Sequence, residues 1–207
     1  MKKINVAING FGRIGRNALR AGWGREGFSV VAINDLTDAA TLAYLLKHDT
    51  NYGLWDVEIV AGKSMLIIDG KKIPVFAEKD PAKLPWKKLK VDVVIESTGF
   101  FTTEEGSMAH IKAGAKRVVI SAPAKGGNVP TYVLGVNHDH LGHEEAKILN
   151  NASCTTNSVA PVTEVIDRVF GIKKAMLTTV HGMTASQSLV DAPKKDLREG
   201  RAASENI

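Results

Sequence analysis

The sequence contains 207 residues with a formal net charge of +5, and 44% of the residues are hydrophobic and 6% aromatic, which is typical of a globular protein. One cysteine excludes an intramolecular disulfide, no apolar run approaches the roughly 18 residues of a membrane helix, and the polar turn at Asn9-Gly10 comes too early for a secretion signal. Because no secretion signal or membrane span is found, we expect a cytoplasmic protein that does not bind a membrane. The basic residues are scattered, so we expect no binding to nucleic acid.

The chain opens with a pattern typical of a βαβ unit. Residues 4–8 form a short β-rich run that ends at Asn9-Gly10, which predicts a buried strand and a tight turn. Apolar residues then recur at helical spacing over residues 13–21, and residues 28–33 are rich in β-branched side chains. We therefore predict a strand, a helix and a second strand in that order.

The middle of the chain continues this alternation after an interruption. Residues 37–47 predict a helix, and residues 57–77 contain two β-rich runs joined around Asp69-Gly70, which indicates an antiparallel hairpin insertion. A strand is then expected at residues 91–95, a helix at 103–113 and a strand at 117–121.

The last third of the chain predicts three more strands and one helix. We expect strands at residues 132–136, 147–149 and 172–180, and a helix over residues 159–170 that Gly171 ends. The whole pattern predicts an α/β fold with a doubly wound parallel sheet, and a new element of the chain begins near residue 153.

A glycine motif lies between the first predicted strand and helix. Gly10, Gly12 and Gly15 form G-x-G-x-x-G, and Asp35 stands at the end of the next strand. In this pattern the first glycine permits a tight turn, the second lets the backbone approach a pyrophosphate and the third lets helix pack on strand. An acidic residue at this spacing accepts hydrogen bonds from a ribose and repels a 2'-phosphate, which favours NAD over NADP. A purely structural glycine turn is the competing interpretation.

Cys154 stands immediately before a predicted helix, among hydroxyl residues. A helix amino terminus or a nearby histidine lowers the pKa of a thiol and favours the reactive thiolate. His181 follows the strand expected at residues 172–180 and is the candidate partner of this cysteine. The alternatives are a buried, inert cysteine and a structural histidine.

Three further histidines, His138, His140 and His143, lie close together in an expected loop. No cysteine or carboxylate arrangement accompanies them, so we expect no metal site.

Several blocks resemble the glyceraldehyde-3-phosphate dehydrogenase family, in the order in which that family carries them. These blocks are Ile8-Asn9-Gly10-Phe11-Gly12-Arg13-Ile14-Gly15-Arg16, Ile33-Asn34-Asp35-Leu36-Thr37-Asp38, Ser121-Ala122-Pro123, Asn151-Ala152-Ser153-Cys154-Thr155-Thr156-Asn157 and Thr178-Thr179-Val180-His181. The resemblance is to the amino-terminal portion of the bacterial glycolytic, NAD-dependent, phosphorylating type. It implies a Rossmann-type NAD-binding domain over residues 1–152 and the beginning of an α+β catalytic domain over residues 153–207, with the remainder of that domain absent.

The resemblance also implies the chemistry and the residues that perform it. Cys154 would attack the aldehyde of glyceraldehyde 3-phosphate, His181 would activate the thiol and accept a proton, and inorganic phosphate would cleave the resulting thioester to give 1,3-bisphosphoglycerate. The cofactor-binding residues implied are Gly10, Phe11, Gly12, Arg13, Ile14, Gly15, Asp35, Lys79, Thr98 and Ser121. The substrate-binding residues implied are Ser153, Thr155 and Thr184.

Two departures and two alternatives accompany the resemblance. Glu199 occupies a position where many bacterial members carry an arginine near the inorganic-phosphate site, and a carboxylate there would repel an anion. The chain stops before the family's later substrate-site and cofactor-site residues, so one alternative is a catalytically incomplete NAD-binding fragment. The other alternative is an erythrose-4-phosphate dehydrogenase, in which water resolves the thioester. A homo-oligomer, a tetramer in the family, is the expected assembly.

Overall fold

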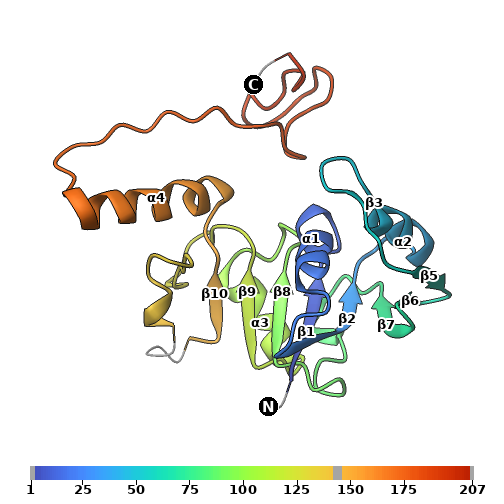
Figure 1. The fold of residues 1–207 in the computed structure, drawn as a ribbon. Coiled ribbons are helices and arrows are strands. Elements are labelled where there is room, and N and C mark those ends of the chain that lie inside the picture. Colours follow the sequence, from blue (N-terminus) through green and yellow to red (C-terminus); the bar gives the residue numbers. More distant parts are fainter. Residues whose placement is uncertain (1–2, 142–145, 206–207) are drawn as a thin grey trace. The chain divides into compact units, whose positions relative to one another are not determined.

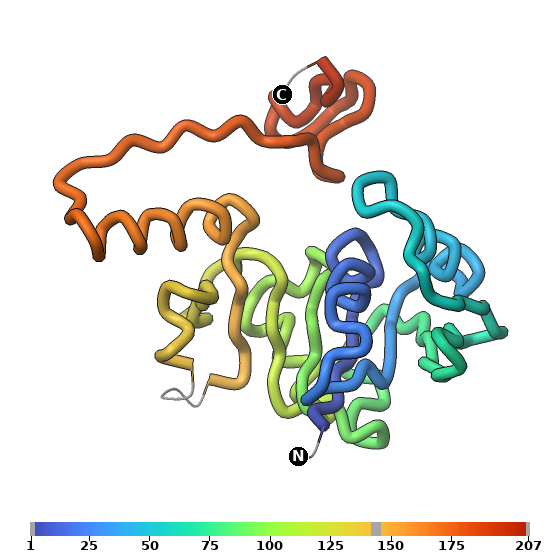
Figure 2. Tube along the Cα trace, viewed as in Figure 1, coloured from blue at the N-terminus to red at the C-terminus, as the bar shows by residue number. Residues whose placement is uncertain are grey.

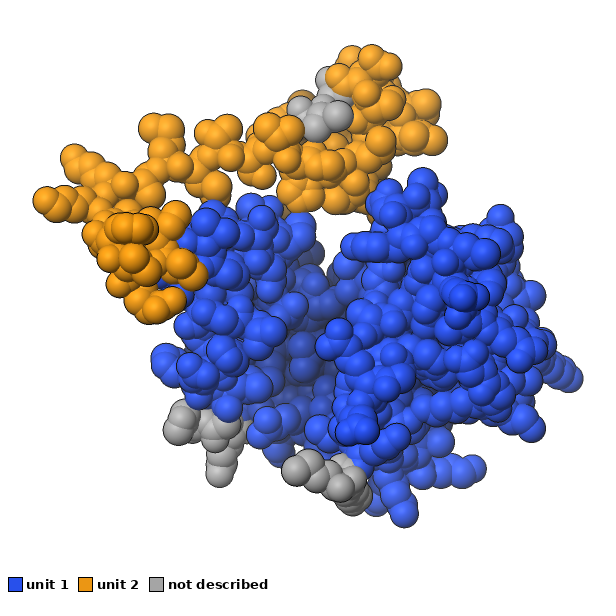
Figure 3. Space-filling model, in the orientation of Figure 1, with its two compact units in different colours: residues 1–164 blue, residues 165–207 orange. Residues whose placement is uncertain are grey.

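The computed structural model describes residues 3–141 and 146–205. The chain divides into two compact units, residues 1–164 (unit 1) and residues 165–207 (unit 2), which Figure 3 colours separately. Unit 1 contains every strand that the structure describes, and unit 2 contains the end of the last helix and a segment whose described residues form neither helix nor strand.

One eight-stranded sheet organises unit 1 (Figure 1). Its strand order is β10-β9-β8-β1-β2-β7-β6-β5, and the strands from β10 to β7 pair in parallel whereas β6 and β5 are antiparallel. The bounds are β1 Ile4–Asn9, β2 Phe28–Asn34, β5 Ile59–Gly62, β6 Met65–Ile68, β7 Lys71–Phe76, β8 Val93–Glu96, β9 Arg117–Ile120 and β10 Ile148–Asn150. The predicted α/β fold with a mostly parallel sheet is therefore confirmed.

Two hydrophobic clusters show that helices cover both faces of this sheet. Successive residues of a strand point to opposite faces, and in β1 Ile8 belongs to one buried cluster while Ala7 belongs to the other. Leu19 of α1 (Arg13–Gly22) and Leu42 of α2 (Ala39–Lys47) pack into the cluster of Ile8, whereas Met108 of α3 (Glu104–Lys112) packs against the cluster of Ala7. This two-sided core is the doubly wound arrangement.

The predicted antiparallel insertion is present and has three strands. Asp69-Gly70 forms the turn between β6 and β7, and β5 adds a third strand. The last residues of β7 return to the parallel sheet, because Val75 pairs with Ile33 of β2. The insertion therefore extends the main sheet and brings the segment after β7 to the carboxyl end of β2. A short hairpin of β3 (His48–Asp49) and β4 (Gly53–Leu54), which the sequence analysis did not predict, precedes it.

The strand predicted at residues 132–136 is wrong. Thr131 makes an isolated bridge to Asn150, and the chain then turns. Asn137 Oδ1 accepts the backbone N–H of Val133 at 2.8 Å, and Gly135 has a φ of 83°. These local turn interactions compete with a ladder that the β-rich composition favours. A 3-10 turn, η2 (His138–His140), follows.

The strand predicted at residues 172–180 is also wrong. The segment has no regular structure (Figure 2), and within the described part of the chain it joins no ladder. Met176 is 94% exposed and Val180 is 90% exposed. β-branched composition favours a strand only where a neighbouring strand satisfies the backbone N–H and C=O groups.

The last helix, α4, spans Cys154–Phe170 and starts earlier than the predicted range of 159–170. It ends as predicted, because Gly171 has a φ of 71° and its N–H bonds to Asp167 O at 2.8 Å. Among the helices that the structure describes, none has the length and apolar character needed to cross a bilayer.

Candidate functional site

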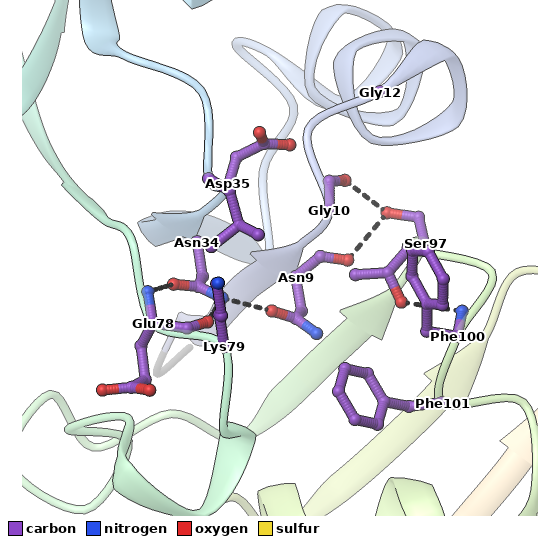
Figure 4. Close-up of a pocket in the computed structure, with 12 residues that line it drawn as sticks. Asn9, Gly10, Gly12, Asn34, Asp35, Glu78, Lys79, Ser97, Phe100 and Phe101 are labelled. Carbon is purple, nitrogen blue, oxygen red and sulfur yellow. Dashed lines mark hydrogen bonds between the residues drawn. The ribbon is translucent and has the colours of Figure 1, made fainter.

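A cavity of about 540 Å³ lies at the carboxyl edge of the sheet in unit 1 (Figure 4). Its walls come from the segments that follow β1, β2, β7 and β8. The lining residues are Asn9, Gly10, Gly12, Asn34, Asp35, Leu36, Glu78, Lys79, Ser97, Thr98, Phe100 and Phe101. In a doubly wound sheet this edge, where the crossovers change direction, is where ligands bind.

The three motif glycines have three different surroundings. Gly10 has a φ of +88°, and a Cβ there would lie 2.6 Å from the backbone N of Thr98. A Cβ on Gly15 would lie 2.2 Å from Gly10 O, whereas a Cβ on Gly12 would meet nothing within 4 Å. The turn is therefore tight at Gly10, close-packed at Gly15 and open at Gly12, which matches the physical requirements of a dinucleotide motif.

Helix α1 begins at this turn without a capping side chain, because its N-cap is Gly12. Backbone N–H groups of a first helical turn, together with the helix dipole, favour an anion. The Arg13 side chain is directed elsewhere: its guanidinium pairs with Asp49 and lies 5.4 Å from the ring centroid of Tyr52. Ile14, the next residue, is exposed, and a main-chain contact of Arg13 and Ile14 with a ligand stays a prediction.

Asp35 presents its carboxylate at the edge of the cavity. Its Oδ2 accepts the backbone N–H of Phe11 at 2.7 Å, and its Oδ1 accepts that of Thr37 at 2.9 Å. Each oxygen keeps a further lone pair for a ligand hydroxyl. The side chain of Phe11 is fully buried in the core, so Phe11 contributes to the site through its backbone.

Five of the predicted cofactor residues line this cavity: Gly10, Gly12, Asp35, Lys79 and Thr98. The other predicted cofactor residues lie outside its lining. They are Phe11, Arg13, Ile14, Gly15 and Ser121. Ser121 follows β9, and its N–H bonds to Glu96 O at 2.9 Å, beside the carboxyl end of β8.

Sequence reasoning missed seven lining residues. Asn9 and Asn34 could have been found, because each is a polar residue at the end of a buried parallel strand. Ser97 follows the predicted strand at 91–95 and carries the same signal. The remaining missed residues had no recognisable signal. They are Leu36, Glu78, Phe100 and Phe101.

The candidate nucleophile occupies a second turn, between β10 and α4 (Figure 2). Ala152 has a φ of +57°, a conformation that non-glycine residues seldom adopt. Asn150 stabilises this turn, because its Oδ1 accepts the Ala152 N–H at 3.0 Å. Ser153 Oγ accepts the Thr156 N–H at 3.0 Å and so caps α4. Cys154 is the first residue of the helix and is exposed.

Thr155 follows Cys154 in α4 and, like Ser153, belongs to unit 1, whereas unit 2 contains the candidates His181 and Thr184. His181 is exposed, and its Nδ1 lies 2.7 Å from Gly182 O. Thr184 Oγ1 lies 3.0 Å from Ser186 Oγ, which donates to Glu199 Oε1 at 3.2 Å. Cys154 belongs to unit 1 and His181 to unit 2, so their pairing stays a prediction.

The histidine cluster gives no metal site in the described part of the chain, where no group of three or more His, Cys, Asp or Glu side chains could hold an ion. His138 Nδ1 accepts the Gly135 N–H at 3.0 Å, and its Nε2 lies 3.4 Å from Asp139. His143 lies outside the described residues.

Comparison with known proteins places this sequence in a family. A family model described as glyceraldehyde 3-phosphate dehydrogenase, NAD binding domain, matches residues 4–104, and one described as the C-terminal domain of the same enzyme matches residues 153–207. The glyceraldehyde-3-phosphate dehydrogenase of Priestia megaterium is 50% identical over 204 residues, which cover 99% of this chain and 61% of that protein. The enzyme of Mycoplasma pneumoniae is 52% identical over 206 residues, which cover 100% of this chain and 61% of that protein.

The enzyme of the same name from Geobacillus stearothermophilus is 50% identical over 204 residues, again 61% of its length. The chain thus spans about three fifths of the curated relatives that it matches. With both domain models matched and with half of all residues identical to these relatives, the chain belongs to the glyceraldehyde-3-phosphate dehydrogenase family, of which it represents the amino-terminal portion.

Proposed function

We propose that this chain belongs to an oxidoreductase that converts glyceraldehyde 3-phosphate, NAD and inorganic phosphate into 1,3-bisphosphoglycerate and NADH. The observation that carries the proposal is the presence, in one chain, of a dinucleotide-type cavity and of an exposed cysteine at the first residue of a helix. The names of relatives that share half of its residues support the same reaction.

The cavity residues fit an NAD molecule. The open space at Gly12 and the uncapped start of α1 suit a pyrophosphate, and the oriented carboxylate of Asp35 suits a ribose with both hydroxyls present. Lys79 and Thr98 line the remaining wall. NAD supplies a hydride acceptor when bound. The negative charge of Asp35 would oppose a 2'-phosphate, which supports NAD rather than NADP.

Cys154 is the proposed nucleophile. Its thiolate Sγ forms a bond to the aldehyde carbon, and the carbonyl π pair moves to oxygen, which takes back the proton that the base removed from the thiol and becomes the hydroxyl of a thiohemiacetal. Loss of the carbon-bound hydrogen as hydride, and of the hydroxyl proton to a base, leaves a thioester. A phosphate oxygen then bonds to the acyl carbon while the C–S bond breaks, which releases the acyl phosphate and restores the thiolate.

His181 is the proposed base that favours the thiolate and accepts the hydroxyl proton. Ser153, Thr155 and Thr184 are the proposed contacts to the substrate and to phosphate. The hydrogen bond that Ser153 Oγ accepts from the Thr156 N–H fixes the first turn of α4, on which Cys154 and Thr155 lie.

The proposal extends to organisation and setting. We assign residues 1–152 to the NAD-binding domain and residues 153–207 to the start of the catalytic domain, with a homo-oligomer, a tetramer in the family, as the working assembly. A reducing compartment protects a thiolate nucleophile from oxidation, which supports a cytoplasmic location.

The test is NADH formation from NAD and glyceraldehyde 3-phosphate, with and without inorganic phosphate, for the unmodified chain and for Cys154→Ser. Phosphate-dependent turnover that the substitution abolishes is the expected result. NAD binding without turnover would show that this chain is a catalytically incomplete NAD-binding module. Turnover that is faster with erythrose 4-phosphate and independent of phosphate would overturn the proposed substrate.

A further inference from the structure

A buried polar network begins at the cavity-lining residues Asn34 and Asn9 and continues to residues outside the cavity lining. Asn34 ends β2, Asn9 ends β1 and Glu96 ends β8, while His110 lies on α3 and Trp86 lies in the loop after the 3-10 turn η1 (Pro81–Lys83). Asn34 is 5% exposed, Asn9 and Glu96 are 1% exposed, and the other two are fully buried. Burying a carboxylate is costly unless its hydrogen bonds are satisfied. Whether the Glu96 carboxylate is satisfied therefore depends on which partner donates in each hydrogen bond.

One chain of donors starts at the cavity wall. Asn34 Oδ1 accepts the backbone N–H of Glu78 at 2.9 Å, which fixes the orientation of the Asn34 amide. Asn34 Nδ2 then donates to Asn9 Oδ1 at 2.7 Å (Figure 4). Because Asn9 Oδ1 is the acceptor, Asn9 Nδ2 faces Glu96 and donates to its Oε2. This chain therefore ends on the Glu96 carboxylate.

A second chain of donors reaches Glu96 from the opposite side. An indole N–H can only donate, and Trp86 Nε1 lies 2.9 Å from His110 Nδ1. Nδ1 must therefore be the acceptor, so a neutral His110 ring carries its hydrogen on Nε2. Nε2 lies 3.0 Å from Glu96 Oε2 and donates to it.

The other carboxylate oxygen also accepts. The backbone N–H of Thr98 lies 2.8 Å from Glu96 Oε1, and the Thr98 hydroxyl donates to the same atom. The Thr98 N–H, the Asn9 amide N–H and the His110 ring N–H can only donate, so each Glu96 oxygen accepts at least one hydrogen bond. Both chains of donors therefore converge on the Glu96 carboxyl group.

We propose that Glu96 is a positioning residue of the cofactor cavity. Its carboxylate holds the end of β1 against the segment after β8, which carries Ser97 and Thr98. Ser97 Oγ donates to Gly10 O at 2.7 Å and lies 3.2 Å from Asn9 O, so the glycine turn is attached to the same segment. The inference rests on the proposed binding of NAD in this cavity. According to this inference, Glu96 determines the affinity for NAD through the residues that it holds, although Glu96 itself does not line the cavity.

The first test measures NAD affinity of Glu96→Gln by calorimetry, with the exposed Glu26→Gln as the matched control. A glutamine amide places its NH2 against either the Thr98 N–H or the Asn9 and His110 donors, whichever way it rotates. We expect the Kd for NAD to rise on the order of tenfold. The alkylation rate of Cys154 without NAD should not change, because the turn that carries it is attached to β10 and not to this network.

Two further measurements keep the proposal falsifiable if Glu96→Gln does not fold. His110→Asn removes the ring donor but no residue that lines the cavity, and it should weaken NAD binding severalfold. Nitrogen NMR of the unmodified chain should show a neutral His110 ring with its hydrogen on Nε2. NAD affinity within twofold of the unmodified chain in every one of the two variants that folds, or a hydrogen on His110 Nδ1, would overturn the positioning role. Failure of the unmodified chain itself to bind NAD would instead overturn the cofactor assignment on which that role depends.

Discussion

Replacing Gly12 by alanine should weaken cofactor binding without weakening the fold. Gly12 has a φ of −72° and a ψ of −155°, which alanine can adopt, and a Cβ there would meet nothing within 4 Å. Glycine is a better N-cap than alanine. Alanine, however, stabilises the folded state by about 0.4–1 kcal/mol, because it lowers the conformational entropy of the unfolded chain. The two effects oppose each other, so the free energy of unfolding should change by less than about 1 kcal/mol.

The added methyl group would occupy the space through which a pyrophosphate approaches the start of α1. We expect the Kd for NAD to rise at least about tenfold, which corresponds to ~1.4 kcal/mol. Calorimetric titration with NAD measures the affinity, and urea denaturation monitored by circular dichroism measures the free energy of unfolding.

Two other glycine substitutions serve as comparisons. Gly10→Ala combines a φ of +88° with a Cβ 2.6 Å from Thr98 N, so it should lower stability by roughly 2–5 kcal/mol. Gly24→Ala has a φ of +75° but nothing within 4 Å, so it should lose only the conformational cost of about 1–2 kcal/mol. Unchanged NAD affinity in Gly12→Ala, or a loss of stability there as large as in Gly10→Ala, would refute this interpretation of the turn.

Three more predictions concern the segments around the candidate catalytic residues. Ser153→Ala should lower the free energy of unfolding by about 1 kcal/mol, because Ser153 Oγ caps α4 at Thr156; an unchanged urea midpoint would contradict this. The pKa of Asp196 is lowered to about 2, mainly by a hydrogen bond from the Arg198 side chain and then by the Arg198 backbone N–H. Its contribution to stability should therefore be present above about pH 3.8 and be lost as the pH falls through about 2, and an NMR titration in which Arg198→Ala leaves this pKa unchanged would exclude the cause. Glu199→Gln removes a negative charge from a side chain that accepts a hydrogen bond from a neighbouring serine hydroxyl. Without this charge the KM for inorganic phosphate in the active assembly should fall severalfold at low salt and less at high salt. Equal KM values for the variant and the unmodified chain would show that Glu199 does not face the anion.

The candidate site could be predicted in part, and the reason differs between residues. The roles of Gly10, Gly12 and Gly15 follow from a turn that is local in the sequence, so spacing was sufficient. Phe100 and Phe101 reach the same cavity from the loop after β8, and no local pattern indicates where that loop lies. The partnership of Cys154 with His181 remains a prediction, because the two residues belong to different compact units.

The fold shows the same division between local and distant effects. The strand at residues 28–33 and the helix at 13–21 were predicted well, because alternation and helical spacing are properties of short segments. Residues 132–136 and 172–180 have strand-like composition, yet neither forms a strand among the described residues. Composition cannot supply the partner that a strand requires.

The sequence by itself determined the βαβ unit, the glycine turn, the acidic residue after the second strand and the cysteine at a helix start, because each depends on neighbours in the chain. Only the tertiary structure decided that the ends of β1 and β2 lie beside the end of β8 and are joined by hydrogen bonds to its buried carboxylate, Glu96. Asn9 and Glu96 are far apart in sequence, and parallel pairing of β1 with β8 brings them side by side. Hydrogen-bond direction in that network depends on Trp86 and Glu78, whose positions follow from packing rather than from any motif.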